Sequence, residues 1–292
     1  IIAKCHGMDS PCIIETVVNM ASVTYAGSAN ELVYVYLGGI IGELDIWDKE
    51  GIVRNCANYG PVTSSVMPSR GGSQVSSDGS VNGVNEIDRS YENIGGIAGW
   101  SRCSLGSVHI KNCFNYGTVT HNGTTSGFMY IGGILGNASG TNNIVNCVNS
   151  GKISLNGEDK TVFAGSVVGQ VYSGIMTIKN CYWTNTVGNY KAYGRNFTAV
   201  NIGSETSQVE LSTATVNNLN SYNSSWNKWL LNENSKQVTF KVGDSKGFVL
   251  STQLTLLPDL TKNEECSFSG WFSDSDCTVP FTEASVPEDI SL

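Results

Sequence analysis

Apolar and polar residues alternate with a period of two along much of the chain, in short runs separated by Gly and Asn. In VHIKNCFNYGTVT, for example, Val108, Ile110 and Cys113 alternate with polar residues. A second kind of run is an aliphatic cluster around paired glycines, as in YIGGILG from Tyr130. Neither kind of run repeats its apolar residues at helical spacing. The pattern therefore predicts many short β-strands joined by tight turns.

Both kinds of run recur in alternation. One phrase reads NCANYGPV from Asn55, NCFNYGTV from Asn112, NCVNSGKI from Asn146 and NCYWTNTV from Asn180, after a degenerate TVVNMASV from Thr16. The other reads YLGGIIG from Tyr36, NIGGIAG from Asn93, YIGGILG from Tyr130 and FAGSVVG from Phe163. The intervals between NC phrases are 57, 34 and 34 residues. Self-similarity at a fixed period indicates a stack of one supersecondary unit.

We therefore expect a mostly all-β chain whose regular part, residues 1–205, is a right-handed parallel β-helix, or solenoid, of about 34-residue repeats. The long first interval places a Gly/Ser-rich segment at 66–89, which predicts a long loop from one corner of the stack. Tetratricopeptide and ankyrin repeats have a similar period, but they need two helices in each unit. The sequence offers no such helices.

The pattern changes after residue 205. Five apolar residues fall near helical spacing, namely Val216, Leu219, Trp226, Trp229 and Leu230. They predict one or two short helices within 206–236, as a cap or connector that covers the open strand edge at the end of the stack. From residue 237 to 292 the pattern is β-like again, which predicts a separate small module.

The repeated cysteines, Cys56, Cys113, Cys147 and Cys181, stand at the same position of each phrase. We expect them to form an inward ladder of small apolar side chains. Disulfides between neighbouring coils are geometrically allowed, because the strand spacing lies within the Cα range of a disulfide. A metal site is not expected, because a linear ladder does not supply tetrahedral ligands.

The repeated asparagines, Asn58, Asn115 and Asn149, predict a second ladder. Stacked Asn side chains can hydrogen-bond to one another along the axis of a parallel stack. The glycines that follow, Gly60, Gly117 and Gly151, are expected to supply the positive φ of a corner. A sugar-binding role for the asparagines is the alternative. The paired glycines of the other phrase indicate close packing between strands, since they lack the Lys-Ser/Thr of a phosphate loop.

Nine cysteines are present, and two short-range pairs, Cys5 with Cys12 and Cys266 with Cys277, are candidate disulfides. Such pairs are typical of an oxidising compartment. Four N-x-S/T sequons, at Asn122, Asn137, Asn196 and Asn223, are candidate N-glycosylation sites of a secreted chain. In a chain this rich in Asn, Ser and Thr, several sequons arise by chance.

The charge pattern excludes some partners. The net charge is −8, from 25 acidic and 17 basic residues, and no Lys/Arg block is present. We therefore expect no nucleic-acid binding. No apolar run approaches the roughly 18 residues of a membrane span, so no membrane insertion of this segment is expected. The chain starts without Met and ends within an expected strand, which suggests a segment of a larger protein.

The acidic residues argue against an enzyme. Glycoside-cleaving sites need paired carboxylates, and between Asn93 and Ser204 the only acidic residues are Glu158 and Asp159, adjacent in an expected turn. One acidic cluster remains, Glu43, Asp45, Asp48 and Glu50, which we interpret as a solvated turn because it lacks the calcium-loop pattern.

His6, His109 and His121 lie in no catalytic motif, and surface positions are expected for them. No cofactor is expected. Trp183, Trp226, Trp229 and Trp271 are interpreted as core residues of the C-terminal third.

The two phrases, N-C-x-N-x-G-x-V and I-G-G-I-x-G, resemble the GLUG-type repeats of large secreted and surface proteins, over about residues 13–185. The resemblance implies right-handed β-helical stalks, such as those of bacterial surface proteins. The fourth copy departs from the family pattern at Trp183, where the family has Asn.

The last segment resembles the Listeria–Bacteroides repeat, the B-repeat of internalin-like surface proteins. Its F-x-G-W-F-x-D signature lies at 268–274, T-x-P-F at 278–281 and D-I-S-L at 289–292. The resemblance implies a small β-grasp-like module over 237–292, used as a spacer or adhesive unit. Cys266 and Cys277 flank its GWF strand, although the family pattern does not require a bridge there.

We therefore expect a non-enzymatic structural or adhesive segment of a large extracellular cell-surface protein, acting as a rigid stalk or interaction scaffold. Its partners would be proteins or glycans at a cell surface, or neighbouring copies of itself. The alternative is a carbohydrate-binding module that uses exposed aromatic residues and Asn/Thr on one face of the solenoid. A polysaccharide lyase or hydrolase is disfavoured by the missing carboxylates.

Overall fold

The computed structural model describes residues 2–26, 28–29, 34–65, 67–68, 91–122, 128–155, 162–222, 227–232 and 237–242. The chain divides into two compact units, Ile1–Glu210 and Leu211–Leu292, which are considered separately below. Most of the described residues lie in β-strands and the sheets of the first unit are parallel, so the prediction of a mostly all-β chain is confirmed.

Each repeat of the first unit contributes one strand to each of several parallel sheets. Two of these sheets together form a part that we call the lobe. The first lobe sheet contains β1 (Ile2–Gly7), β7 (Ile41–Ile46), β13 (Ala98–Cys103), β18 (Leu135–Ser139), β23 (Val168–Ser173) and β26 (Tyr193–Asn196). The second lobe sheet contains β2 (Cys12–Glu15), β8 (Glu50–Arg54), β14 (Ser107–Lys111), β19 (Asn142–Val145), β24 (Met176–Lys179) and β27 (Val200–Ile202). The connecting sheet contains β3 (Val18–Asn19), β9 (Ala57–Asn58), β15 (Phe114–Asn115), β20 (Val148–Asn149), β25 (Tyr182–Trp183) and β28 (Ser207–Gln208).

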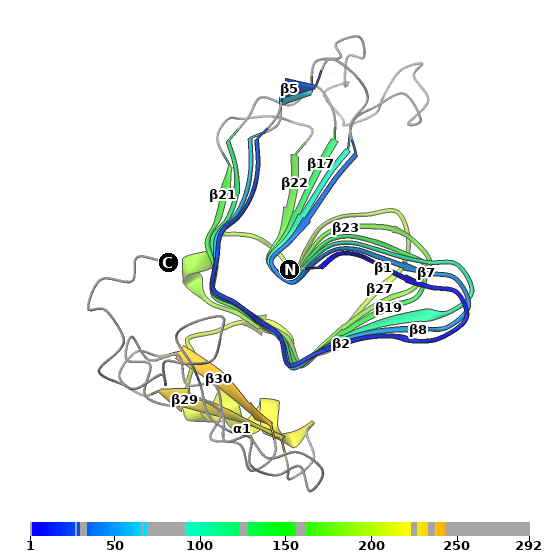
Figure 1. Cartoon of the computed structure of the whole chain (residues 1–292). Helices are drawn as coiled ribbons and strands as arrows, with labels where there is room; N and C mark the ends of the chain where they lie inside the picture. The colour runs from blue at the N-terminus through cyan, green and yellow to red at the C-terminus, as the bar shows by residue number, and fades with distance from the viewer. Residues whose placement is uncertain are drawn as a thin grey trace, which may run out of the picture. The chain divides into compact units, whose positions relative to one another are not determined.

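Two further sheets form an arm beside the lobe (Figure 1). The first arm sheet contains β4 (Val23–Tyr25), β10 (Val62–Ser64), β16 (Val119–His121) and β21 (Ile153–Leu155). The second arm sheet contains β6 (Tyr34–Gly38), β12 (Tyr91–Gly95), β17 (Phe128–Gly132) and β22 (Val162–Gly165). The short strands β5 (Ser28–Ala29) and β11 (Met67–Pro68) pair farther out on the arm. The rest of the predicted 66–89 loop lies outside the described residues.

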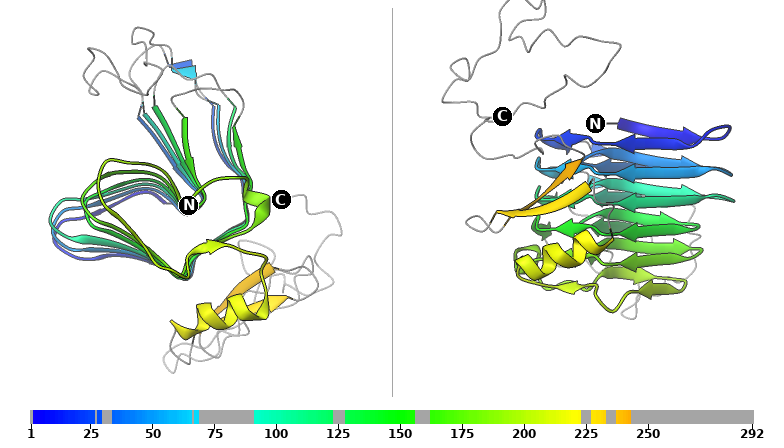
Figure 2. Two further views of the ribbon diagram at one scale, coloured as in Figure 1. Left: turned by 180° about the vertical axis from the view of Figure 1, so that it is seen from behind. Right: turned by 90° about the horizontal axis from the view of Figure 1, so that it is seen from below.

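The strands of successive repeats stack in register, as the layers in Figure 2 show. Equivalent residues are 39, 57 and 34 positions apart along the first four copies. Aliphatic side chains of the lobe and arm point between the sheets and form one core, which includes Ile41, Ile94 and Ile131. The alternation of apolar and polar residues thus places one apolar row of every strand inside the stack.

An asparagine ladder runs through the core of the connecting sheet. The Asn19 Nδ2 donates to Asn58 Oδ1 at 2.8 Å, the Asn58 Nδ2 to Asn115 Oδ1 at 2.8 Å, and the Asn115 Nδ2 to Asn149 Oδ1 at 2.9 Å. All four side chains are buried. The second glycine of each pair packs against this ladder: a Cβ on Gly133 would lie 1.9 Å from the Asn149 Nδ2. The two sequence phrases therefore recur together because the Asn of one phrase packs against the second glycine of the other.

The corner before each cysteine differs from the prediction. Positive φ occurs at Asn55, Asn112, Asn146 and Asn180, and at Thr16 in the degenerate copy. The predicted positions, Gly60, Gly117 and Gly151, do not have positive φ; they are glycine because a Cβ there would meet the carbonyl of the previous coil at about 2 Å. The first Asn of each phrase takes the left-handed corner because its short polar side chain tolerates that conformation. These Asn residues form a second ladder, in which the Asn180 Nδ2 donates to Asn146 Oδ1 at 2.7 Å.

The cysteine ladder lies inside the stack. Cys56, Cys113, Cys147 and Cys181 are buried free thiols. Each Sγ contacts backbone carbonyls, as Cys56 does with Arg54 O at 3.1 Å. Burial and the neighbouring sulfurs of Cys113 and Cys181 raise the pKa of Cys147 well above its ordinary value, which keeps this thiol protonated. The structure therefore uses the ladder as apolar filling and not as a chain of disulfides.

The repeat changes at its fourth copy. Trp183 pairs in register with Asn149, at the position where the earlier copies have Asn. Ser166 replaces the second glycine, and its carbonyl accepts the last hydrogen bond of the ladder from the Asn149 Nδ2. After β25 the chain forms a 3-10 helix, Asn185–Val187, and then enters β26 directly. This last coil has no arm strands, and its final strand, β28, lies just beyond the expected boundary at residue 205.

The second unit contains the predicted helix and an unexpected hairpin. Helix α1 (Thr213–Ser221) begins at Ser212, whose Oγ accepts from the Thr215 backbone N–H. The strands β29 (Asn227–Asn232) and β30 (Gln237–Val242) then pair antiparallel. The prediction that Trp229 and Leu230 are helical is wrong, because they alternate buried and exposed along β29. The Asn220 side chain fixes this arrangement by bonding the backbone N–H and carbonyl of Trp229.

Of the predicted C-terminal module, only β30 lies in the described part of the chain. Residues 243–292 lie outside it, and with them Cys266, Cys277 and Trp271. Trp226 and Asn223 are also outside it. The capping role of 206–236 stays a prediction.

Replacing Asn115 by Ala tests the ladder. The change removes hydrogen bonds to both neighbouring Asn side chains and to the Gly117 carbonyl, and leaves buried partners unpaired. We expect a loss of about 2–4 kcal/mol in the free energy of unfolding, measured by urea denaturation. The control is Asn143→Ala on the outer face of β19, with an expected effect within about 0.5 kcal/mol. Equal losses in the two variants would contradict the ladder's role.

Candidate functional site

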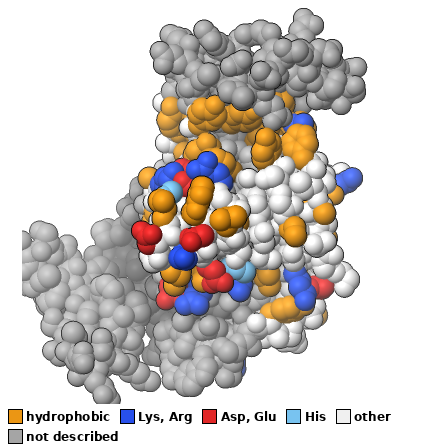
Figure 3. All heavy atoms as spheres, turned by 90° about the vertical axis from the view of Figure 1, so that its right-hand side faces the viewer, with side chains coloured by type: hydrophobic (Ala, Val, Ile, Leu, Met, Phe, Trp, Pro, Cys, Tyr) orange, Lys and Arg blue, Asp and Glu red, His pale blue; other side chains and the backbone are white. Residues whose placement is uncertain are grey.

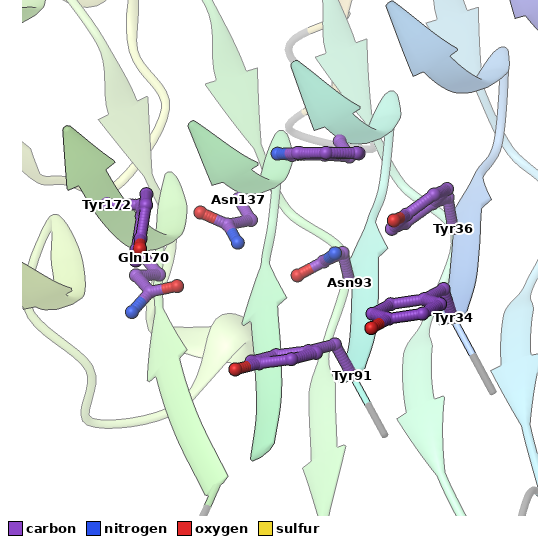
Figure 4. Close-up of a pocket in the computed structure, with 8 residues that line it drawn as sticks. Tyr34, Tyr36, Tyr91, Asn93, Asn137, Gln170 and Tyr172 are labelled. Carbon is purple, nitrogen blue, oxygen red and sulfur yellow. The ribbon is translucent and has the colours of Figure 1, made fainter. Parts of the chain in front are cut away.

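A groove lies on the outside of the stack, where the second arm sheet meets the first lobe sheet. It has a volume of about 270 Å³, just below the range of about 300–1,000 Å³ for typical ligand pockets. Figure 4 shows the lining side chains. They are Tyr34, Tyr36, Tyr91 and Asn93 from β6 and β12, and Trp100, Asn137, Gln170 and Tyr172 from β13, β18 and β23.

Aromatic rings form the walls of the groove. The Tyr34 and Tyr91 rings stack with centroids 5.9 Å apart and planes 8° apart. Tyr36 contacts Trp100 across the junction of arm and lobe, with ring centroids 4.7 Å apart. Tyr34 and Tyr172 are about half exposed, at 50% and 47%. Burial, with the nearby Glu43 charge, raises the pKa of Tyr36 to about 12, so its phenol stays neutral at physiological pH.

Primary amides form the floor. Asn93, Asn137 and Gln170 are only 2%, 7% and 1% exposed. The Oδ1 atoms of both Asn residues and the Nε2 of Gln170 have no hydrogen-bond partner among the described residues, nor does the Trp100 Nε1. A buried polar group without a partner costs about 1–3 kcal/mol. The floor therefore has unused hydrogen-bonding capacity at the place where the walls are apolar.

The groove exists because an aromatic row is interrupted. Tyr36, Asn93, Tyr130 and Phe163 occupy equivalent register positions on four neighbouring strands of the second arm sheet. Asn93 alone among them lacks a ring, and its smaller side chain leaves the space open. At the end of the groove nearest the last coil, the Arg195 guanidinium lies over the Phe163 ring, 4.6 Å from its centroid, and fills the corresponding space. The interruption at one repeat thus creates a bounded groove.

The interpretation of the acidic cluster as a solvated turn fits Asp48 and is corrected for Glu43 and Asp45, which lie on β7. Asp45 lies buried on β7, where its carboxylate pairs with Lys4 at 3.0 Å and Arg102 at 2.9 Å and lies 3.0 Å from the His6 Nδ1. The charges come from three successive strands of the first lobe sheet. Although burial acts to raise it, the bonds from Lys4 and Arg102 hold the pKa of Asp45 below its ordinary value.

The other members of the cluster are dispersed. Glu43 pairs with Lys4 and lines a neighbouring hollow of about 280 Å³, which shares Tyr34 and Tyr36 with the groove. Asp48 lies in the following turn and pairs with Lys49, and Glu50 begins β8. Among the described residues, no group of three or more His, Cys, Asp or Glu side chains could hold a metal ion.

His121 is not at the surface, which corrects a second prediction. It is buried between the arm sheets, with its Nδ1 3.4 Å from the Glu92 Oε2. Ser64 donates to the same carboxylate oxygen at 2.9 Å. His109 is half-buried and lies 2.9 Å from the Ser107 hydroxyl, and His6 is partly exposed beside Asp45. The three histidines therefore lie apart, in three different environments.

The candidate disulfides and sequons fall in different places. Cys5 and Cys12 form a disulfide that joins β1 to β2. Asn196 is exposed on β26, and Asn122 is exposed at the end of the described arm. Asn137 is not in a surface loop but on the floor of the groove. A glycan attached there would fill the groove, so Asn137 is better assigned to the groove than to glycosylation.

Most residues of the groove were not singled out from the sequence. The sequence analysis looked for aromatic contacts in the C-terminal third, but the two tryptophans described there, Trp183 and Trp229, are buried. The available signal was the Asn that replaces a Tyr or Phe in NIGGIAG, the only one of the four GG phrases without an initial aromatic residue. The facing residues, Trp100, Asn137 and Gln170, form a second row that only the register reveals.

One face of the described surface carries mixed charge. On the face shown in Figure 3, acidic and basic side chains are intermingled. No helix in the described part of the chain is both long and apolar enough to cross a membrane.

Comparison with known proteins finds no match: no family model, no curated protein and no solved structure matches the chain. The resemblances to GLUG-type and Listeria–Bacteroides repeats therefore stay predictions. The description of the groove depends on the geometry alone.

The charged cluster around Asp45 predicts a pH dependence of stability. A carboxylate with a lowered pKa stabilises the fold above its unfolded pKa of about 3.9 and loses this contribution as the pH falls through the folded value. We expect Asp45→Asn to lower the free energy of unfolding at pH 7 by about 1 kcal/mol, because the cationic partners are half exposed. As the pH falls toward 2, the difference in stability between the variant and the original chain should shrink.

The comparison uses urea unfolding at both pH values, with Asp48→Asn in the exposed turn as the matched control. A difference for Asp45→Asn that persists undiminished at pH 2 would show that its charge is not the cause.

Proposed function

We propose that this chain is a non-enzymatic, adhesive segment of a large extracellular cell-surface protein, built as a right-handed parallel β-helix that binds glycan in the groove between arm and lobe. The stacked register and the two asparagine ladders support a rigid scaffold. The Cys5–Cys12 disulfide supports an oxidising compartment. The GLUG-type phrases and the internalin-like C-terminal segment belong to the same proposal.

The observation that carries the binding proposal is the pairing of stacked rings with unpartnered amides. Sugar rings present apolar C–H faces and a rim of hydroxyl groups. Tyr34, Tyr91 and Trp100 offer flat apolar area at little cost in conformational entropy. Asn93, Asn137 and Gln170 offer donors and acceptors that the described protein leaves unused. A few polar groups placed on an apolar pocket are typical of small-ligand sites.

The lining favours a neutral ligand that is bound and not cleaved. Of the described residues that line the groove, none is acidic, basic or His. Hydrolysis of a glycosidic bond needs two carboxyl groups placed on either side of it. Glu43, in the neighbouring hollow, is held by Lys4 at 3.1 Å. Binding is therefore the activity that these side chains support.

Two variants of the whole chain test this proposal, with saccharide binding measured on a glycan array and then by calorimetry. Trp100→Ala removes one wall, and we expect at least a tenfold loss of affinity. Asn93→Tyr restores the aromatic row and should fill the groove, which abolishes binding while the fold stays intact.

The matched control is Trp47→Ala, which removes an exposed Trp in the turn after β7, away from the groove. Its affinity should equal that of the original chain, and melting curves check that all variants fold. No binding to any saccharide at millimolar concentration would sink the proposal, and so would binding that survives Asn93→Tyr.

A further inference from the structure

The floor of the groove suggests which sugar it holds. Asn137 and Gln170 are register partners on β18 and β23, so their backbones lie about 4.8 Å apart. Asn93 lies across the groove from them on β12 (Figure 4). Three primary amides thus surround a small space, and no charged side chain lines it.

The same protein shows what stacked amides do when they have partners. In the core ladder, amides on successive strands bond one another at 2.8–2.9 Å. Asn137 and Gln170 are related by the same step between neighbouring strands, yet the Asn137 Oδ1 and the Gln170 Nε2 remain unpartnered among the described residues. Unlike the rungs of the core ladder, these two neighbouring amides do not satisfy one another.

We infer that the acetamido group of a saccharide bridges these floor amides, so that the groove selects N-acetylated amino sugars. This inference rests on the proposed function. A secondary amide carries one N–H donor and one C=O acceptor on a planar group, which complement an acceptor end of one floor amide and a donor end of the other once these turn toward the groove. The methyl group of the acetamido is apolar, as are the surrounding rings.

The complementarity needs one side chain to turn its donor end, and the other its acceptor end, toward the groove. The terminal torsion of Asn and Gln is soft, so either end of each side chain can face the groove. Each primary amide has one donor end and one acceptor end. The pair can therefore adjust to a planar amide, which also has one of each.

Charged sugars fit less well. A uronic acid or a free amino sugar would bring a charge to a lining that offers no opposite charge. Arg102 and Glu43 are already paired with Asp45 and Lys4, and Arg195, the register partner of Gln170, lies over the Phe163 and Phe197 rings. Burying an unpaired charge is costly. A hydroxyl of a plain glucan carries its donor and its acceptors on one oxygen atom. It therefore bridges two amides whose backbones lie about 4.8 Å apart less well than a planar amide, whose N–H and C=O are on separate atoms.

The test measures calorimetric affinity of the whole chain for two trisaccharides with the same β-1,4 gluco backbone: tri-N-acetylchitotriose and cellotriose. We expect the acetylated sugar to bind at least tenfold more tightly. Gln170→Met keeps the shape of the side chain but removes both its donor and its acceptor. It should lower chitotriose affinity about tenfold more than cellotriose affinity, so that the preference disappears. Trp47→Ala, as the control, should keep the preference, and melting curves confirm the fold of each variant.

Three outcomes decide between the proposals. A preference that Gln170→Met removes supports the inference. Equal affinity for both trisaccharides, or a preference that survives Gln170→Met, overturns it while glycan binding in the groove still stands. If a folded chain binds neither trisaccharide, the inference falls; if it also binds no other saccharide on the array, the proposed function falls with it.

Discussion

The structure of the first unit depends on the contact between buried Asn side chains and the paired glycines of the next phrase. An amide in the core must find partners, because an unsatisfied buried amide costs more than a hydrogen bond gains. Asn58, Asn115 and Asn149 find theirs along the stack. They can do so only if the neighbouring backbone comes close, and the glycines permit that approach. The ladder therefore fixes the register, and the register places every other row of side chains.

Much of this architecture could be predicted from the sequence, because comparison of the repeat copies shows which positions the stack constrains. Residues that recur at one position in every copy are those that the stack constrains. Cys113 is buried as predicted, and Asn115 bonds its neighbours along the stack as predicted. The corner was assigned to the wrong residue because both Asn and Gly tolerate positive φ, and the choice between Asn112 and Gly117 depends on carbonyls of the previous coil. The strand at Trp229 was missed because Asn220, nine residues earlier, holds its backbone.

The candidate site was harder to predict, because it depends on what differs between the copies. Asn93 is informative only when it is aligned with Tyr36, Tyr130 and Phe163. The facing row is not part of either phrase, so Trp100 and Gln170 carry no repeat signal at all. The acidic first coil attracted attention through its composition, but its charges neutralise one another across three strands. The acidic residues drew attention because they are close in the sequence. The residues of the candidate groove are close only in the stack.

The arm is present in the first four coils and is replaced in the last by the short 3-10 helix Asn185–Val187. Since each coil adds one strand spacing to the junction of arm and lobe, the number of arm-bearing coils sets how long that junction is. A gene that duplicates or deletes one 34-residue repeat would lengthen or shorten it by about 4.8 Å, with the internal ladders preserved. Evolution could thus adjust the length of the junction in whole steps, by copy number, without redesigning any single contact.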